Sequence, residues 1–340
     1  MEAAYKKVKL LKSIYRFFRK VLSKYIEKPM LKLLYTIGMV IGIWKREGYY
    51  IVRIDGGISS QIEMYLLGLA LKKTKGNDVN ILYDLTWFKE CGMDLNNVYV
   101  RNFDLLKLYP NLEFEEVTPL LRTIYYKCYR FETQWREYKS LPITDLPTMP
   151  LYLDGYGYQV SAQMKNQIYN IDGLMRLPQP NLVLDSRNLE VLTKIQTEKM
   201  AVAVQVRRGD MATAGFTTRP LEPQYFIKAI CSSYFEGAVF YFFSDEMQWV
   251  YDEIIPCLDQ SIKYYIVDIN GSDKGYMDLY LCANCRHFVS SQGSFGEKAA
   301  MLGAKEGSIL VMPKFRYYEG LKEMFPQLTI YTIDENCMME

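Results

Sequence analysis

The chain has 340 residues, of which 49% are hydrophobic, so it is long enough to form two domains with cores of their own. Its net charge is only +2, and it contains 29 tyrosines but a single histidine. One histidine excludes metal sites that need a histidine pair, and so small a net charge argues against a body built to bind nucleic acid.

The positive charge is concentrated at the amino-terminal end. Residues 1–50 contain 12 of the 41 basic and 3 of the 39 acidic residues, a balance of +9 that leaves −7 for the rest. Residues 6–28 predict an amphipathic helix with apolar side chains on one face and lysine or arginine on the other, which Pro29 ends or bends. Packing on the body and nucleic-acid binding are alternatives, but the acidic body and the aromatic face favour an anionic membrane surface.

The run that follows, residues 33–44, is largely apolar and 12 residues long. A membrane-spanning helix needs about 20 residues, so we expect an interfacial or core segment. No small-residue cleavage site of a secretory signal accompanies the early lysines. The sequence therefore predicts a cytoplasmic protein attached peripherally to the inner face of the cytoplasmic membrane.

The seven cysteines are scattered and odd in number, which indicates reduced thiols. Cys282 and Cys285 form a CxxC pair, but no second pair exists to complete a structural zinc site. We expect both to be core cysteines on one helix face.

The body begins with a predicted strand–turn–helix–strand unit. A strand at 49–57 runs into a glycine turn, a helix capped by Ser59 or Ser60 extends to Gly76, and a second strand covers 79–85. Residues 90–150 are less regular and rich in aromatic and charged side chains, and 150–159 predict a bend rich in glycine and tyrosine.

The second half alternates cleanly between apolar strands and helices. Strands are predicted at 200–206, 237–244, 263–268, 286–291 and 308–313, and helices at 222–234, 245–255, 274–285 and 294–304. Apolar strands separated by helices are typical of a parallel sheet covered on both faces. We therefore expect an α/β protein with a basic segment (1–48) and two domains (49–195 and 196–340).

Ligands of such sheets bind beyond the carboxyl ends of the strands, and three of these ends carry polar groups: Arg207–Asp210, Ser244–Glu246 and Ser290–Ser294. The guanidiniums of Arg207 and Arg208 are donors suited to phosphate oxygens. Because strand side chains alternate, only one of them can face a ligand, and we expect the other to brace Asp210 or the turn. A solvated arginine pair is the alternative.

Two glycine-rich turns, at 55–61 and 290–300, each stand between a strand and a helix and predict anion cradles. The first lacks the spacing of the dinucleotide-binding and Walker motifs. The second is not a hydrolase elbow around Ser294, because Gln292 occupies the required glycine position and His287 precedes the serine. His287 is expected to be structural. No DxD motif is present, so arginine and backbone amides, rather than a metal, are expected to hold a diphosphate.

Several segments together resemble the alpha-1,2-fucosyltransferases. VAVQVRRGD resembles the family's HxRRxD motif, and RIDGGISSQIEMYLLGLAL resembles its amino-terminal glycine-rich segment. LYLDGYGYQ, YFFSDEMQWV, YMDLYLCANCRHFVSSQGSFGEKAAMLG and ILVMPKFRY resemble later blocks in the family's order, over about residues 50–320. Gln205 stands where the family has histidine, Ile58–Ser60 replace its LGN, and Gly296–Lys298 replace a tryptophan-containing segment.

The resemblance implies a GT-B fold, two Rossmann-like domains facing across a cleft, with the acceptor on the 49–195 side and the donor on the 196–340 side. It implies inverting, metal-independent transfer of fucose from GDP-fucose to a hydroxyl, such as the 2-OH of galactose, of a lipid-linked bacterial surface glycan such as O-antigen. Alternatives are another GDP-sugar donor, or an inactive GDP-binding or membrane scaffold protein.

The resemblance also assigns roles to residues. Arg207 is expected to hold the β-phosphate, with Gly56 and Gly57 letting backbone approach the diphosphate, and Arg207 and Asp210 are the catalytic residues. Asp210 and Glu63 are the candidate general bases. The remaining donor-binding residues are Gln205 and Arg208, Ser244, Asp245 and Glu246 near the nucleoside, and Ser291 and Ser294 as donors to the phosphates.

Overall fold

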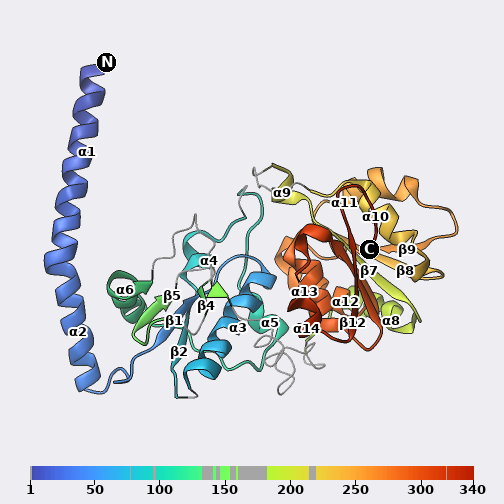
Figure 1. Cartoon of the computed structure of the whole chain (residues 1–340). Helices are drawn as coiled ribbons and strands as arrows, with labels where there is room; N and C mark the ends of the chain where they lie inside the picture. Colours follow the sequence, from blue (N-terminus) through green and yellow to red (C-terminus); the bar gives the residue numbers. More distant parts are fainter. Residues whose placement is uncertain are drawn as a thin grey trace. The chain divides into compact units, whose positions relative to one another are not determined.

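The structure is a computed structural model that describes residues 2–76, 78–94, 97–131, 141–142, 146–153, 158–159, 182–213, 220–318 and 320–340. The chain forms two compact units, each assembled from several segments (Figure 1). The first contains residues 1–53, 71–84 and 114–159, and the second contains 54–70, 85–113 and 160–340. The predicted bend at 150–159 lies partly outside the described residues.

The first unit contains a parallel sheet in the order β2-β1-β5-β3. Its strands are β1 (Tyr50–Arg53), β2 (Ile81–Asp84), β3 (Arg130–Phe131) and β5 (Leu151–Leu153). A separate two-stranded sheet pairs β4 (Leu141–Pro142) with β6 (Tyr158–Gln159), and α6 (Pro119–Cys128) packs on β3 and β5. The strand–helix–strand opening predicted from the sequence is confirmed.

The helix of that opening, α3, extends from Ile58 to Lys75. Gly76 follows it with a φ of +112°, which confirms the predicted end. The predicted serine cap is wrong, because Ser59 and Ser60 lie inside the first turn. The chain turns through Gly56 and Gly57, and the carbonyl of Gly57 already accepts hydrogen bonds from the backbone N–H groups of Ser60 (2.9 Å) and Gln61 (3.1 Å).

The amino-terminal segment is one uninterrupted helical path. It consists of α1 (Glu2–Leu22), a π-helical turn (Ser23–Glu27) and α2 (Lys28–Val40). The expectation that Pro29 ends the helix is wrong. Pro29 stands in the first turn of α2, directly after the wider π turn, where a missing backbone N–H is tolerated. Within the described part of the chain, no helix has the length and apolar character needed to cross a membrane.

The inner face of α2 packs against α6 through tyrosines. The hydroxyls of Tyr35 and Tyr125 are hydrogen-bonded at 2.6 Å, and the backbone N–H of Tyr49 donates to the Tyr125 hydroxyl at 3.0 Å. Trp44 stacks against Tyr35 at 5.5 Å between ring centroids. Part of the apolar run 33–44 is therefore core, as expected, and its other side chains are exposed.

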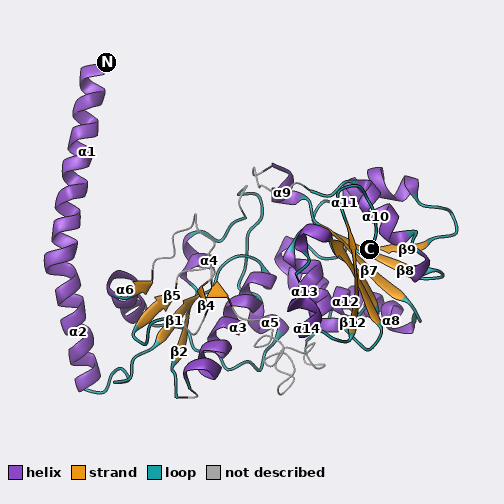
Figure 2. Ribbon diagram, in the orientation of Figure 1, coloured by secondary structure: helices purple, strands orange, loops and turns teal. Residues whose placement is uncertain are grey.

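The second unit is built on a six-stranded parallel sheet, order β12-β11-β10-β7-β8-β9 (Figure 2). Its strands are β7 (Ala201–Val206), β8 (Val239–Ser244), β9 (Lys263–Ile266), β10 (His287–Val289), β11 (Ser308–Pro313) and β12 (Leu328–Ile333). The five predicted strands are confirmed, and β12 was not predicted. The two separate parallel sheets confirm the α/β class and are those expected of a GT-B chain.

Helices cover both faces of this sheet. On one face, Val202, Val204 and Val206 share a core with Phe226 and Ile230 of α10 (Pro223–Ile230). The other face contacts α12 (Gly275–Ala283) and α13 (Ser294–Gly303), and α8 (Ser186–Thr197) packs on α12.

The remaining helices of the second unit are short. They are α4 (Thr86–Glu90), α5 (Leu105–Leu108), α9 (Gly209–Thr213), α11 (Met247–Trp249), a π turn (Val250–Ile254), α14 (Gly320–Met324) and 3₁₀ turns at Ser233–Phe235, Ile255–Cys257, Ser272–Lys274 and Lys314–Arg316. All seven cysteines are free, and the CxxC pair is buried against the sheet. Burial raises the pKa of both Cys282 and Cys285, as expected of inert core thiols.

Candidate functional site

The topology of the second sheet singles out one edge as a ligand site. Counted along the chain within the unit, its strands run in the order 3-2-1-4-5-6, that of a doubly wound nucleotide-binding sheet. The central neighbours β7 and β10 are the switch point, where the chain turns to opposite sides of the sheet. Ligands bind beyond the carboxyl ends of the strands at such a point. Here those ends are Arg207 and the Ser290–Gln292 segment.

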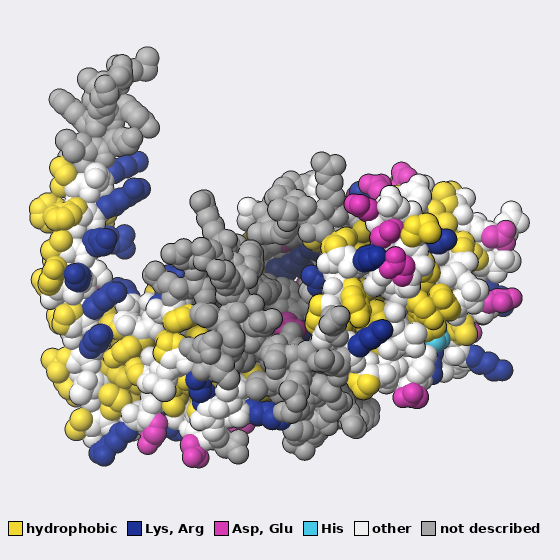
Figure 3. Space-filling model, viewed as in Figure 1, with side chains coloured by type: hydrophobic (Ala, Val, Ile, Leu, Met, Phe, Trp, Pro, Cys, Tyr) yellow, Lys and Arg dark blue, Asp and Glu magenta, His cyan; other side chains and the backbone are white. Residues whose placement is uncertain are grey.

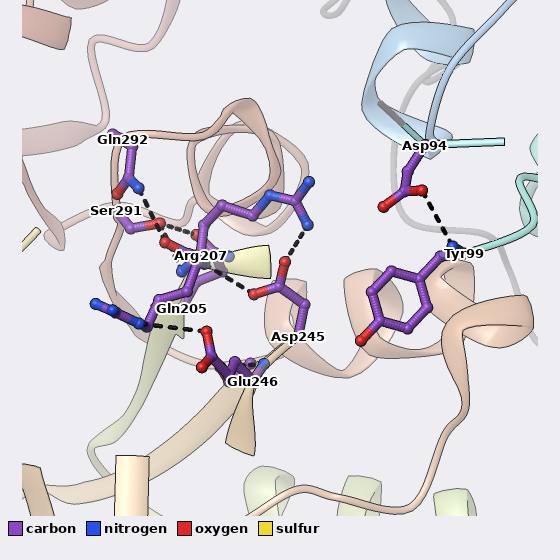
Figure 4. A network of polar contacts seen from close by, with 10 residues as sticks. Asp94, Tyr99, Gln205, Arg207, Asp245, Glu246, Ser291 and Gln292 are labelled. Carbon is purple, nitrogen blue, oxygen red and sulfur yellow. Dashed lines mark hydrogen bonds and ion pairs between the residues drawn. The ribbon is translucent and has the colours of Figure 1, made fainter. Parts of the chain in front are cut away.

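Arg207 is held from several directions at this edge (Figure 4). Its guanidinium forms an ion pair with the carboxylate of Asp245, and its backbone N–H donates to the Ser291 hydroxyl at 3.1 Å. Its carbonyl accepts a hydrogen bond from the Gln292 amide at 2.9 Å. The Arg207 side chain is 21% exposed. A guanidinium presents its N–H donors in a planar fork that suits phosphate oxygens, and this one is both fixed in place and partly exposed at the ligand edge.

Arg208 lies two residues beyond the end of β7, and its side chain points elsewhere. Its guanidinium lies 4.0 Å from the ring centroid of Trp249, and its Nε lies 3.4 Å from a carboxylate oxygen of Glu246. The expected bracing role is met by Glu246 and Trp249. The alternative of a solvated arginine pair does not fit, because both arginines are only partly exposed and both have acidic partners.

Asp245 is the residue that ties the two arginines together. One carboxylate oxygen pairs with Arg207, and the other accepts the backbone N–H of Arg208 at 2.9 Å. Gly209 makes room for this carboxylate, since its φ is +27° and a Cβ there would collide with Asp245. The structure gives Asp245 a role as the support of Arg207, and its expected position near the nucleoside stays a prediction. Ser244 accepts the Glu246 N–H at 3.0 Å and closes the turn, while Glu246 is exposed.

Ser291 and Gln205 are a buried, hydrogen-bonded pair that supports Arg207. The Ser291 hydroxyl donates to the Gln205 side-chain oxygen at 2.6 Å, and both residues are buried. Since this hydroxyl proton is committed to Gln205, it is not available to a phosphate. The structure gives both residues a positioning role beside Arg207, and their expected contact with the donor stays a prediction. Ser294, in the first turn of α13, is exposed.

The structure places the other predicted residues as follows. Gly56 has a φ of +71°, which favours glycine, and the space around the Cα of Gly57 is open, with Arg101 at 4.0 Å from a Cβ built there. Asp210 lies in α9, but its side chain is outside the described residues. Glu63 is paired with Lys298, whose side chain is only 3% exposed.

Several contributors were missed by the sequence analysis. Gln292 was noted only for breaking a hydrolase motif, yet it clamps the carbonyl of Arg207. The Tyr225 hydroxyl donates to the Ser290 carbonyl at 2.7 Å, and burial raises the pKa of Tyr225, which keeps this donor protonated. Asp94 is not joined to this network by any hydrogen bond among the described residues (Figure 4); it is buried, one carboxylate oxygen accepts the N–H groups of Val98 and Tyr99, and the other has no hydrogen-bond partner among the described residues. No short-range pattern marks such contacts.

His287 is structural, as expected. Its Nδ1 accepts the backbone N–H of Ile309 at 3.1 Å, and burial, followed by the charge of Arg286, lowers its pKa to about 4. In the described part of the chain, no three His, Cys, Asp or Glu side chains are grouped as metal ligands.

The model of glycosyl transferase family 11 matches residues 121–324, which is more than half of the chain. The chain belongs to glycosyl transferase family 11. It is therefore a glycosyltransferase of a fucosyltransferase family, and the resemblance noted in its sequence is confirmed at that level. The match includes the switch point of the second sheet and the whole Arg207 network.

Solved structures are similar to this family 11 glycosyltransferase only at low identity. The fucosyltransferase NodZ from Bradyrhizobium is 12% identical, with 87% of this chain and 98% of that chain covered and a TM-score of 0.45. POFUT1 in complex with GDP is 15% identical, with 74% and 93% covered and a TM-score of 0.39. TM-scores this low carry no functional argument. No curated protein matches the chain.

Proposed function

We propose that this protein transfers fucose from GDP-fucose, with inversion and without a metal, to a hydroxyl of a bacterial surface-glycan precursor, such as the 2-OH of galactose. The observation that carries the proposal is Arg207, a partly exposed guanidinium fixed at the switch point of a doubly wound sheet in a family 11 chain. Two expectations rest on the sequence resemblance alone: that the acceptor is lipid-linked, and that the accepting sugar is galactose.

The geometry supports a specific task for Arg207. When a nucleoside diphosphate leaves a sugar, negative charge grows on its β-phosphate, and a donor already held in place stabilises that charge without reorganising. Asp245, Ser291 and Gln292 hold the side chain and both backbone polar groups of Arg207. Arg207 is thus proposed as the catalytic cation, with Asp245 and Ser291 as positioning residues.

The attacking hydroxyl must lose a proton, and three carboxylates are candidate acceptors. Asp210 and Glu63 follow from the sequence, and Glu63 is already engaged in an ion pair with Lys298. Asp94 is added because one of its buried oxygens has no partner among the described residues. Replacing each by its carboxamide separates them: the base is the residue whose replacement abolishes transfer while leaving GDP binding intact.

The deciding experiment incubates the protein with a panel of sugar nucleotides in EDTA, with and without oligosaccharide acceptors, and follows nucleotide release. Release of GDP from GDP-fucose, and from no other sugar nucleotide of the panel, supports the proposal. Release from a different GDP-sugar identifies another donor, and GDP binding without turnover of any sugar identifies a binding or scaffold protein. Strict dependence on Mg²⁺ or Mn²⁺ would refute metal-independent transfer, in which arginine replaces the metal at the diphosphate.

A further inference from the structure

The exposed side of the α1–α2 helix is apolar over almost its whole described length. Between Ile14 and Ile41 its outward side chains include Phe18, Leu22, Tyr25, Leu33, Ile37 and Val40, each 46% exposed or more, and we call this surface the outer row. At about 1.5 Å per residue, the outer row is about 40 Å long.

The π turn is what makes the outer row continuous. An α-helix advances by about 100° per residue, and on an unbroken helix the exposed apolar residues of α2 would point about 100° away from those of α1. A π turn contains one residue more than an α turn, so Ser23–Glu27 cancels this offset. Figure 3 shows the outcome, with hydrophobic side chains along one side of both helices and lysines and arginines along the other side of α1.

The core of the first unit does not cover the outer row. The opposite side of α2 already packs there, since Tyr35 and its neighbours Leu31 and Met39 join a cluster with Ile124 and Tyr125 of α6. An ion pair between Glu27 and Lys127 adds a second fastening at the π turn. A partner other than the unit itself is needed to cover the outer row.

Charge identifies that partner. Residues 12–40 contain seven lysines or arginines and one acid, Glu27, which is paired with Lys127. A second copy packed along the same face would bring two basic helices together, whereas an anionic lipid surface complements them. Long basic side chains can bury their stems and reach the headgroups, and Tyr15 and Tyr25 suit a boundary that is apolar on one side and wet on the other.

We propose that the α1–α2 helix lies flat on an anionic membrane, with the outer row inserted at the boundary between headgroups and acyl chains. The tyrosine cluster beneath α2 then fastens the first unit to the bound helix. This inference is independent of the proposed function, because it concerns lipid binding alone.

The test is co-sedimentation of the full chain with vesicles of phosphatidylcholine alone, or with about one third phosphatidylglycerol, at low and high salt. We expect binding to the anionic vesicles that weakens with salt. Leu22→Glu should lower binding at least about 10-fold, while Leu189→Glu on α8 should leave it unchanged. The two leucines are matched controls, since each lies on a helix and each is 54% exposed.

Two further pairs of variants test charge and register. Arg16→Glu with Lys20→Glu should abolish binding, and Arg187→Glu with Lys228→Glu, the same charge change on exposed residues of the second unit, should not. Deleting Ser23 converts the π turn to an α turn and should weaken binding several-fold, whereas Ser23→Ala should not.

Two results would overturn the proposal. One is sedimentation of the Leu22→Glu protein like wild type. The other is a wild-type dimer in solution that ignores vesicles and that Leu22→Glu converts to a monomer, which would make the outer row a contact between copies. Circular dichroism confirms that each variant keeps its helix content.

Discussion

Each unit of this protein has an arginine–aspartate pair near the carboxyl end of its parallel sheet, and the two pairs differ in exposure. In the first unit, Asp84 ends β2, is fully buried, and accepts from the Arg122 guanidinium at 3.0 Å and from the Tyr152 hydroxyl at 2.5 Å. In the second, Asp245 is 22% exposed beside an equally exposed Arg207. The two arginines are almost equally exposed, since Arg122 is 20% exposed and Arg207 is 21% exposed, so the pairs differ in the burial of the aspartate. A fully buried carboxylate ties its arginine to the fold, whereas a partly exposed carboxylate leaves the edge around its arginine open to a ligand.

The largest effect should come from breaking the buried pair. Arg122→Met removes a charged partner from the fully buried Asp84 carboxylate and should lower the free energy of unfolding by about 3–5 kcal/mol. The protein that remains folded should bind GDP as wild type does. Urea unfolding followed by circular dichroism measures the first quantity, and GDP titration at low temperature the second. A stability equal to that of wild type would contradict the structural role of this pair.

The reverse pattern is expected at the open pair. Arg207→Lys keeps the charge but loses two-pronged donation, and turnover should fall about 100-fold or more while the melting temperature stays within about 2 °C of wild type. Arg187→Lys on the surface of α8 is the control. The measurement is GDP release from GDP-fucose in the presence of acceptor, and near-normal turnover would remove Arg207 from the site.

A smaller loss of turnover is expected at Asp245, the residue that supports Arg207. Asp245→Asn preserves a hydrogen-bond acceptor but removes the charge that orients Arg207, and turnover should fall about 10-fold. Because Asp245 acts through Arg207, the same substitution in an Arg207→Lys background should cost clearly less. Full additivity of the two losses would show that Asp245 has an independent role, such as contact with the nucleoside.

The smallest effect concerns an aspartate whose partner is an amide rather than an arginine. Burial is the main cause that raises the pKa of Asp278 to about 7, and its carboxylate accepts from Asn270 at 2.7 Å. The unfolded chain releases this proton near pH 4 and the folded chain near pH 7, so the group's contribution to stability is lost as the pH rises between them.

Asp278→Asn keeps the shape and the hydrogen bond but cannot ionise. Relative to wild type, its free energy of unfolding should therefore increase between pH 4 and pH 8, by on the order of 1 kcal/mol because Asp278 is only partly buried. Thermal unfolding of both proteins across this range measures the difference. A difference that does not change with pH would mean that Asp278 ionises normally in the folded protein.

Local pattern was enough to predict much of the second unit. The five predicted apolar runs form parallel strands, and Arg207 directly follows the first of them. Both could be predicted because strands and helices each leave a pattern within a few neighbouring residues. The strand β12 and the helix α8 were missed, although their packing against β11 and α12 makes them part of the same layered unit.

The roles of the polar residues could not be predicted in the same way. Ser291, Asp245 and Gln205 were assigned to the ligand by the family resemblance, and the structure turns each of them toward Arg207 or its support. Whether a hydroxyl donates to a ligand or to a neighbouring side chain depends on the pairing of β7 with β8 and β10. These pairings join residues 38 and 85 positions apart.

The sequence by itself determined the α/β class, the doubly wound second half, the arginine pair and the amphipathic character of the first 40 residues, because periodicity and charge are local properties. Only the tertiary structure decided which arginine faces the ligand edge, which aspartate holds it, and that the helical path continues through Pro29 instead of ending there. It also aligned the apolar sides of α1 and α2 through one π turn. The contacts of Arg207 arise because segments distant in sequence are brought together. The alignment of α1 with α2 arises because one extra residue in the π turn rotates α1 about the helix axis. Neither effect can be predicted from a window of a few residues.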